Sequence, residues 1–294
     1  MIDLYRPVLA AACAQAGLSA AGARVIRIGE NAIFVLPGRV VVRIARLGQH
    51  PAAVKEVRIA RWLADHGVAA VRALDGIVQP VQIGGRAVTF WQELPPHRHG
   101  TPGEVAGALR RLHQLPVPEF LRPLAPFTRL AQRIDAATTL SAQDRSWLRG
   151  HLSELQQRYT GLPAGLPRQV VHGDAWVGNV VTTDDGHTVL LDLERCAVGP
   201  PEWDLVSTAI KHTSFAWVSA QDYQDFCDRY GHDVTTWNGF ELLRDTRELR
   251  MTCYLAQHAT EHSTARSEAA LRVACLRGRL GPRPWNWTPA PGVP

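Results

Sequence analysis

The residues best suited to chemistry lie in a short polar segment of the second half of the chain. His172, Asp174 and Asn179 follow two valines with the spacing H-x-D-x-x-x-x-N. Phosphoryl transfer needs a carboxylate near the attacking hydroxyl and an oxygen ligand for magnesium, and one short loop that ends in Asn can supply both. The spacing therefore predicts Asp174 as the general base and Asn179 as a metal ligand.

A second carboxylate is predicted to return to this segment through a hairpin. Residues 179–183 and 188–192 have the β-branched character of strands, and the Asp185-Gly186 pair between them favours a tight turn. Such a hairpin brings Asp192 back beside Asn179. Because Mg²⁺ prefers an octahedral set of oxygens from one or two protein groups, phosphates and water, we expect Asp192 to be the principal metal ligand.

Three segments together resemble the aminoglycoside phosphotransferase family, much of which choline and fructosamine kinases share. They are His172 to Asn179, then Asp192-Leu193-Glu194, then Gly199-Pro200-Pro201-Glu202-Trp203-Asp204-Leu205. Any one of these aspartates alone is better explained as a turn or cap residue, but their order and distances favour a kinase site. The resemblance implies an α+β, protein-kinase-like fold of two lobes, with ATP and Mg²⁺ as cofactors and a small-molecule hydroxyl compound as acceptor. It also implies that His172 is structural and that Asp204 braces the catalytic loop.

The same resemblance implies a nucleotide site in the first part of the chain. There Arg43 stands where such kinases usually have lysine, and Glu56 is its natural ion-pair partner. The alternative for this pair is a solvated ion pair without function. The resemblance further implies a loop over the phosphates and a hinge whose backbone pairs with adenine. The residues assigned to nucleotide binding are Gly29, Asn31, Arg43, Glu56, Gln92 and Leu94.

The order of expected elements agrees with two domains. Strands are expected at residues 24–28, 32–36, 39–45, 78–83 and 86–92, with a helix at 51–66. Residues 94–100 read as a linker, and capping sequences at Thr101, Ser141 and Ser219 then begin helices. We predict a small five-stranded antiparallel N-lobe at 1–94 that binds nucleotide. A mainly helical C-lobe at 95–294 would carry the catalytic loop and the acceptor-binding helices. Its tail, from residue 281, is either loosely ordered or a strap over this lobe.

Composition and charge narrow the class of protein. The chain has 294 residues, 46% of them hydrophobic, with a net charge of +5 and a pI near 9.2. The basic residues are scattered rather than massed, which argues against a nucleic-acid partner. No apolar stretch reaches membrane-spanning length, so we expect no membrane association and a cytoplasmic location. The five cysteines contain no C-x-x-C pair and suggest neither a disulfide framework nor a zinc site.

The acceptor is less well defined by the sequence. Residues 222–248 carry seven acidic residues against three arginines, which would suit a cationic acceptor. Glu241, Asp245 and Glu248 recur on one helix face and are predicted to bind the acceptor. The alternative is a solvated face paired with Arg244 and Arg247. An antibiotic such as an aminoglycoside, which would imply a role in antibiotic resistance, and a metabolite such as choline, an amino sugar or a nucleoside both stay open.

Two other functions are alternatives to a kinase. His258, Glu261 and His262 have the H-x-x-E-H spacing of a hydrolytic metal centre, but no third ligand is marked and the kinase segments would be unexplained. A non-catalytic ATP-binding pseudokinase has no support beyond the arginine at position 43. The sequence therefore favours an enzyme that transfers the γ-phosphate of ATP to a hydroxyl.

Overall fold

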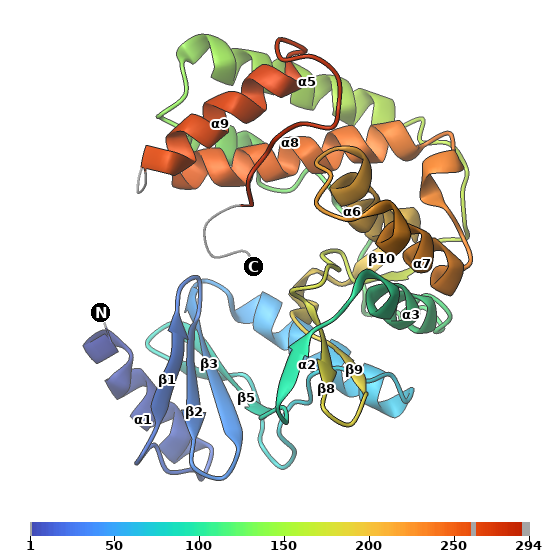
Figure 1. The fold of residues 1–294 in the computed structure, drawn as a ribbon. Coiled ribbons are helices and arrows are strands. Elements are labelled where there is room, and N and C mark those ends of the chain that lie inside the picture. Colours follow the sequence, from blue (N-terminus) through green and yellow to red (C-terminus); the bar gives the residue numbers. More distant parts are fainter. Residues whose placement is uncertain (1, 260–262, 290–294) are drawn as a thin grey trace. The chain divides into compact units, whose positions relative to one another are not determined.

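The structure, a computed structural model, describes residues 2–259 and 263–289. Its elements form two compact units. The first unit comprises the described residues up to Gly100 together with Asn179–Cys196, and the second comprises Thr101–Gly178 and the described residues from Ala197 onward. Figure 1 shows the elements of both units. Asp174 therefore folds with the second unit, whereas Asn179 and Asp192 fold with the first.

The first unit is built on a five-stranded antiparallel sheet with the strand order β1-β2-β3-β5-β4. Its strands are β1 (Arg24–Ile28), β2 (Ala32–Leu36), β3 (Val40–Leu47), β4 (Val81–Ile83) and β5 (Arg86–Gln92). These are the five strands that the sequence predicts, with β3 and β4 shifted by a few residues at their ends. The hairpin turn between β4 and β5 has both of its glycines at positive φ, as the Gly-Gly pair requires.

Two helices cover the two faces of this sheet. On one face, α1 (Arg6–Gln15) packs through Leu9 against the inward side chains of β2, β3 and β5. Side chains of a strand alternate between the two faces. Val42 belongs to the core on the α1 side, so its neighbour Arg43 lies on the opposite face, where it meets α2 (His50–Asp65). The alternation of β3 thus delivers Arg43 to its partner on α2.

A second sheet of the first unit contains a strand that the sequence did not indicate. Its order is β6 (His97–His99), β8 (Val180–Thr183) and β9 (Thr188–Leu190), and both pairings are antiparallel. The predicted linker at 94–100 therefore contains β6 and joins the first unit. All three β6 residues are exposed, so the strand has no apolar alternation by which it could be recognised.

The second unit is mainly helical. Its helices and short strands are α3 (Pro102–Leu112), α4 (Leu130–Ala136), α5 (Ala142–Tyr159), β7 (Gln169–Val171), β10 (Ala197–Gly199), α6 (Glu202–Thr213), α7 (Ala220–Tyr230), α8 (Phe240–His258) and α9 (Ser263–Leu276). The three predicted capping starts are confirmed. Thr101 and Glu104 form a capping box, while Ser141 and Ser219 each accept a hydrogen bond from the backbone three residues on.

The core of the second unit surrounds α8, which packs against α4, α5, α6 and α9 (Figure 1). The described part of the tail is a strap. The Trp285 amide donates to the Ser214 carbonyl at 2.7 Å, and the Trp217 indole donates to the Trp287 carbonyl at 2.9 Å. Both tail tryptophans are buried. Among residues 2–259 and 263–289, no helix combines the length and the apolar character needed to cross a membrane.

Candidate active site

A buried carboxylate, that of Asp204, accepts hydrogen bonds from the backbone of the segment that begins with His172. Asp204, in the first turn of α6, accepts hydrogen bonds from the His172 amide at 2.6 Å and the Gly173 amide at 2.8 Å. The Trp203 indole donates to the Gly173 carbonyl at 3.1 Å. Gly173 has a φ of +84°, which a residue with a side chain rarely adopts. This geometry turns the chain directly after β7 and leaves Asp174 at the bend.

The charge of Asp204 is stabilised by a histidine that the sequence did not single out. Burial raises the pKa of this carboxyl, but the hydrogen bond from His113 and the charges around it outweigh burial and hold the pKa below its usual value. His113 lies 3.2 Å from Asp204 and bonds the Tyr230 hydroxyl through its other ring nitrogen at 2.8 Å. His113 and Asp204 are 91 positions apart, so no local pattern links them.

Asp174 presents a partly exposed carboxylate, with 37% of its side chain accessible. Arg247 of α8 approaches it to 4.0 Å. The Arg247 guanidinium also stacks over the Trp203 ring at 4.1 Å and donates to the Trp203 carbonyl at 2.6 Å. The sequence suggested Arg247 only as a partner for acidic residues of its own helix, and the structure shows that it also contacts the segment that carries Asp174.

The hairpin of β8 and β9 brings together the two residues predicted to bind metal. Val180 pairs with Leu190, and the Leu191 amide donates to the Asn179 carbonyl at 2.9 Å, so Leu191 lies opposite Asn179 and Asp192 is the next residue along the chain. Asp192 has a φ of +52°, a left-handed conformation that Asp tolerates better than most residues. The described residues contain no group of three or more His, Cys, Asp or Glu side chains able to hold a metal. A magnesium site of the kinase type needs only one or two protein oxygens beside phosphates, and the pair fits that chemistry.

Arg43 is the centre of a network within the first unit. Its Nη1 lies 2.7 Å from both Glu56 carboxylate oxygens, and its Nη2 lies 2.9 Å from Glu194. With the Asn31 amide turned so that its oxygen faces the guanidinium, this oxygen accepts from Nη2 at 2.8 Å and from Nε at 2.9 Å. Three of the assigned residues, Asn31, Arg43 and Glu56, therefore meet. Glu194 joins them, although its place in the motif predicted no such role.

The carboxylates around Arg43 keep it charged. Burial lowers the pKa of the guanidinium, but Glu56, Asp192 and Glu194 raise it above its usual value. Burial raises the pKa of Glu56 to about 7, and Arg43 opposes this shift.

Gly29, which was also assigned to nucleotide binding, has no conformational need for glycine. A Cβ built there would meet nothing within 4 Å, and its φ is not positive. The structure thus gives no steric reason for a glycine at position 29.

We expect Arg43→Ala to weaken Mg-ATP binding by at least tenfold, because it removes a buried cation and releases Glu56 and Glu194 from their shared partner. Isothermal titration calorimetry would measure the affinity. Arg46→Ala is the matched control, since Arg46 lies on the same strand and forms an exposed pair with Glu30 at 3.3 Å. Equal affinities of the two variants for Mg-ATP would contradict the assignment of Arg43 to the nucleotide site.

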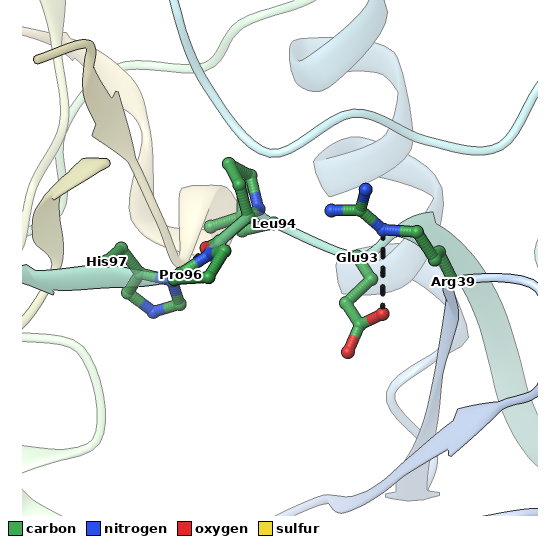
Figure 2. Close-up of a pocket in the computed structure, with 6 residues that line it drawn as sticks. Arg39, Glu93, Leu94, Pro96 and His97 are labelled. Atoms are coloured by element: carbon green, nitrogen blue, oxygen red, sulfur yellow. Dashed lines mark hydrogen bonds and ion pairs between the residues drawn. The ribbon is translucent and has the colours of Figure 1, made fainter. Parts of the chain in front are cut away.

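Two backbone amides of the predicted hinge already donate hydrogen bonds to other parts of the first unit. The Gln92 amide donates to the Arg72 carbonyl and the Glu93 amide to the Arg39 carbonyl, both at 2.9 Å. Figure 2 shows the recess beside this segment and the Arg39–Glu93 ion pair of 3.9 Å. Its volume is about 450 Å³, and its lining residues are Arg39, Glu93, Leu94, Pro95, Pro96 and His97. Leu94 lines this recess, whereas Gln92 does not.

The three carboxylates predicted to bind the acceptor share one face of α8, and arginines contact each of them. Glu241 and Asp245 both contact Arg244, at 3.4 Å and 3.1 Å. Glu248 has no accessible side-chain surface and bonds Arg283 at 2.6 Å. Burial raises the pKa of Glu248, and Arg283 opposes this rise. The face is therefore largely neutralised, and part of it lies under the tail.

Of the three residues of the alternative metal centre, the structure describes only His258. Glu261 and His262 lie outside the described residues. The His258 ring bonds the carbonyl of Tyr254 at 2.9 Å, within its own helix.

Comparisons with known proteins show which family this chain belongs to. The model of the phosphotransferase enzyme family matches residues 22–244, well over half of the chain. The chain therefore belongs to the phosphotransferase enzyme family. This confirms the predicted enzyme class, a kinase that uses an alcohol group as acceptor, and the predicted α+β, protein-kinase-like fold. No match was found among curated proteins.

Solved structures similar to this chain share its fold at low sequence identity. A choline/ethanolamine kinase family protein from Mesorhizobium loti has a TM-score of 0.65 and 20% identity, over 95% of this chain and 94% of that one. An aminoglycoside phosphotransferase from Streptomyces rimosus has a TM-score of 0.60 and 22% identity, over 84% and 98%. An amicoumacin kinase, in complex with AMP-PNP, Ca²⁺ and Ami, has a TM-score of 0.64 and 14% identity, over 88% of each chain.

Proposed function

We propose that this phosphotransferase moves the γ-phosphate of ATP to a hydroxyl of a small molecule, with Asp174 as the base. The observation that carries the proposal is the braced loop. Asp204 fixes the backbone on the N-terminal side of Asp174, and the Asp174 carboxylate is itself accessible. A base must reach the proton that it removes while its own position is fixed. The amicoumacin kinase bound to AMP-PNP supports ATP as the donor.

The chain's own residues take distinct parts in this reaction. The Asp174 carboxylate accepts the proton of the acceptor hydroxyl. At the same time the hydroxyl oxygen bonds to the γ-phosphorus, and the bond from this phosphorus to ADP breaks. Asn179 and Asp192 would supply the oxygens that hold magnesium. Arg43, held in place by Glu56 and Asn31, would supply positive charge for the nucleotide phosphates. Gly29, and the hinge from Gln92 to Leu94, would contact the nucleotide through the backbone. Bound magnesium would neutralise phosphate charge during transfer.

The acceptor proposed from the sequence is an antibiotic or sugar-like compound, with a metabolite such as choline, an amino sugar or a nucleoside as the alternative. The arginine contacts of Glu241, Asp245 and Glu248 weigh against a polycation held by these three residues. We propose that they support α8 and the tail instead. A cytoplasmic location, where ATP and Mg²⁺ are abundant, is part of the same proposal.

The test is an ADP-release screen with purified protein and Mg-ATP. Aminoglycosides, nucleoside antibiotics, amino sugars and choline-like alcohols would each be offered as acceptors, and the phosphorylated product would be identified by mass spectrometry. We expect acceptor-dependent ADP release from one of these groups. Nucleotide binding without ADP release for any acceptor would favour the pseudokinase and contradict the proposal.

A further inference from the structure

The arginine proposed to contact the nucleotide phosphates already donates to protein oxygens through every nitrogen of its guanidinium. Nη1 of Arg43 bonds both carboxylate oxygens of Glu56 at 2.7 Å. Nη2 bonds Glu194 at 2.9 Å and the turned Asn31 amide at 2.8 Å, and Nε bonds the same Asn31 oxygen at 2.9 Å. All four residues belong to the first unit. Because arginine has five N–H donors, a phosphate that binds Arg43 must displace one of these partners or share its donor.

The three partners of Arg43 differ in how readily they can leave it. The Glu56 side chain is 5% accessible, whereas that of Glu194 is 29% accessible. Displacing Glu56 would leave a buried carboxylate without its cation, which is costly, but Glu194 can be hydrated when it leaves. Asn31 is neutral, so replacing it would add a second anion beside Glu194 instead of exchanging one anion for another. Glu194 is therefore the partner that a phosphate displaces at the lowest cost.

A second cation lies near Glu194 in the same unit. Lys55 is on α2, one position before Glu56, and its ammonium donates to the Cys196 carbonyl at 3.2 Å. Burial lowers the pKa of this ammonium, and the Glu194 carboxylate is among the groups that raise it. The short helix that contains Glu194, η2 (Leu193–Arg195), packs against α2. A Glu194 carboxylate that leaves Arg43 therefore stays close to a positive charge.

The chemistry of the two ligands makes the exchange possible. Carboxylate and phosphate are the two anions whose oxygens match the donors of an arginine fork, and both form charge-assisted hydrogen bonds with it. A phosphate oxygen can thus take the place of Glu194 on Nη2 with a bond of the same kind. Glu56 and Asn31 would hold the Arg43 side chain in place throughout the exchange.

We propose that Glu194 competes with a phosphate of the nucleotide for Nη2 of Arg43, and that bound nucleotide releases this carboxylate toward Lys55. This inference rests on the proposed function, which places the nucleotide phosphates at Arg43. It makes Glu194 a positioning residue. Before nucleotide binds, Glu194 satisfies the donor that the phosphate later takes, and it lowers the affinity for nucleotide by the strength of the bond that must be broken.

The first test compares the affinity for ATP of the wild type, Glu194→Gln and Glu154→Gln. Magnesium is removed with EDTA so that metal binding does not contribute, and calorimetry measures binding without an acceptor. An amide bonds Arg43 more weakly than a carboxylate does, so we expect Glu194→Gln to bind ATP about tenfold more tightly than the wild type. Glu154→Gln, which removes a charge from an exposed pair with Arg158 at 3.6 Å, should bind like the wild type. Adenosine, which has no phosphate, should bind all three proteins equally.

A double-mutant cycle separates this competition from simple repulsion between Glu194 and ATP. Repulsion would act without Arg43, whereas competition for Nη2 requires it. We therefore expect Glu194→Gln to leave the affinity for ATP unchanged in an Arg43→Ala background, and a gain of the same size there would overturn the inference. Asn31→Ala should weaken ATP binding. If it strengthened binding instead, Asn31 would be the displaced partner and the inference would be wrong.

Lysine labelling provides a second measurement that needs no variant of Arg43. The sequence contains two lysines, Lys55 and Lys211, so competitive labelling with acetic anhydride, read by mass spectrometry, follows each one separately. In the wild type, ATP should slow the labelling of Lys55 near pH 8 by about threefold, a shift of about half a pKa unit, because the released carboxylate stabilises its ammonium. This slowing should be absent in Glu194→Gln. Equal slowing in both proteins, or none in the wild type, would show that Glu194 does not move toward Lys55 and would overturn the inference.

Failure of this inference and failure of the proposed function give different results. If the wild type and Glu194→Gln bind ATP with equal affinity, the inference is wrong, and the proposed kinase still stands or falls by the ADP-release screen. If neither protein binds ATP, the proposed function itself is contradicted. Because the binding measurements need no acceptor, an acceptor missing from the screen cannot be mistaken for a failed competition.

Discussion

Asp174→Asn is expected to reduce turnover by roughly 10²–10⁴-fold, the range typical of a lost general base, while the affinity for Mg-ATP stays near that of the wild type. The substitution preserves shape and hydrogen bonding but removes the group that accepts the hydroxyl proton. The Asp174 side chain is 37% accessible, so the fold should tolerate the amide. Single-turnover kinetics with the acceptor from the ADP-release screen would measure the loss, and calorimetry would measure nucleotide affinity.

Asp192→Asn provides the contrast. Asp192 is proposed to hold magnesium, so its replacement should weaken Mg-ATP binding as well as turnover, because the phosphates lose their counter-charge. The two aspartates would then differ in one measurable quantity, nucleotide affinity. If Asp174→Asn transferred phosphate at close to the normal rate, the assignment of the base would be wrong.

Much of the first unit could be predicted because its signals are local. The strands β1, β2 and β5 were predicted within their observed bounds from β-branched runs and turn residues. The three helix starts at Thr101, Ser141 and Ser219 depend on contacts only three residues apart, which a sequence displays directly. The hairpin of β8 and β9 is local in the same sense. Its turn and its two strands lie within about a dozen residues, so the approach of Asp192 to Asn179 followed from the pattern.

The supporting contacts could not be predicted, because they join residues far apart in the chain. Arg43 meets Glu194 across 151 positions, and Arg283 meets Glu248 across 35. Neither pair has a spacing that repeats along a helix or strand. Glu248 shows the consequence. Its spacing correctly placed it on one face of α8, but only the fold reveals that the tail arginine covers it. The residues proposed to touch substrate can be predicted from motifs, whereas the residues that hold them in place depend on tertiary structure.

The division of the chain into units illustrates the same limit. A boundary drawn along the sequence, at residue 94, assumes that each domain is a continuous stretch. The hairpin that carries Asn179 and Asp192 instead folds with the first unit, because β8 pairs with β6. The pairing partner of β8 lies some 80 residues earlier and is exposed on all its side chains. Neither strand therefore indicates the other in the sequence.

Asp204→Ala is expected to lower the free energy of unfolding by about 3–5 kcal/mol, the range for a buried charged group that loses its partners. The Asp204 side chain is fully buried and accepts from the amides of His172 and Gly173 and from His113. Alanine would leave these three donors without an acceptor, and each unsatisfied buried donor costs about 1–3 kcal/mol. Urea unfolding followed by tryptophan fluorescence would measure the change. Asp225→Ala is the control, since the exposed Asp225–Arg229 pair of α7 should contribute less than about 1 kcal/mol.

The dependence of this loss on pH tests the electrostatic part of the argument. The folded state holds the pKa of Asp204 below its ordinary value of 3.8. The stability that this carboxylate contributes is therefore fully present above about pH 4 and is lost as the pH falls through the folded-state pKa. The gap in unfolding free energy between the wild type and Asp204→Asn should be present above about pH 4 and should narrow on further acidification. A gap that widens in acid would mean that Asp204 is protonated in the folded protein, and the loop before Asp174 would then be held by a neutral acid rather than by a buried charge.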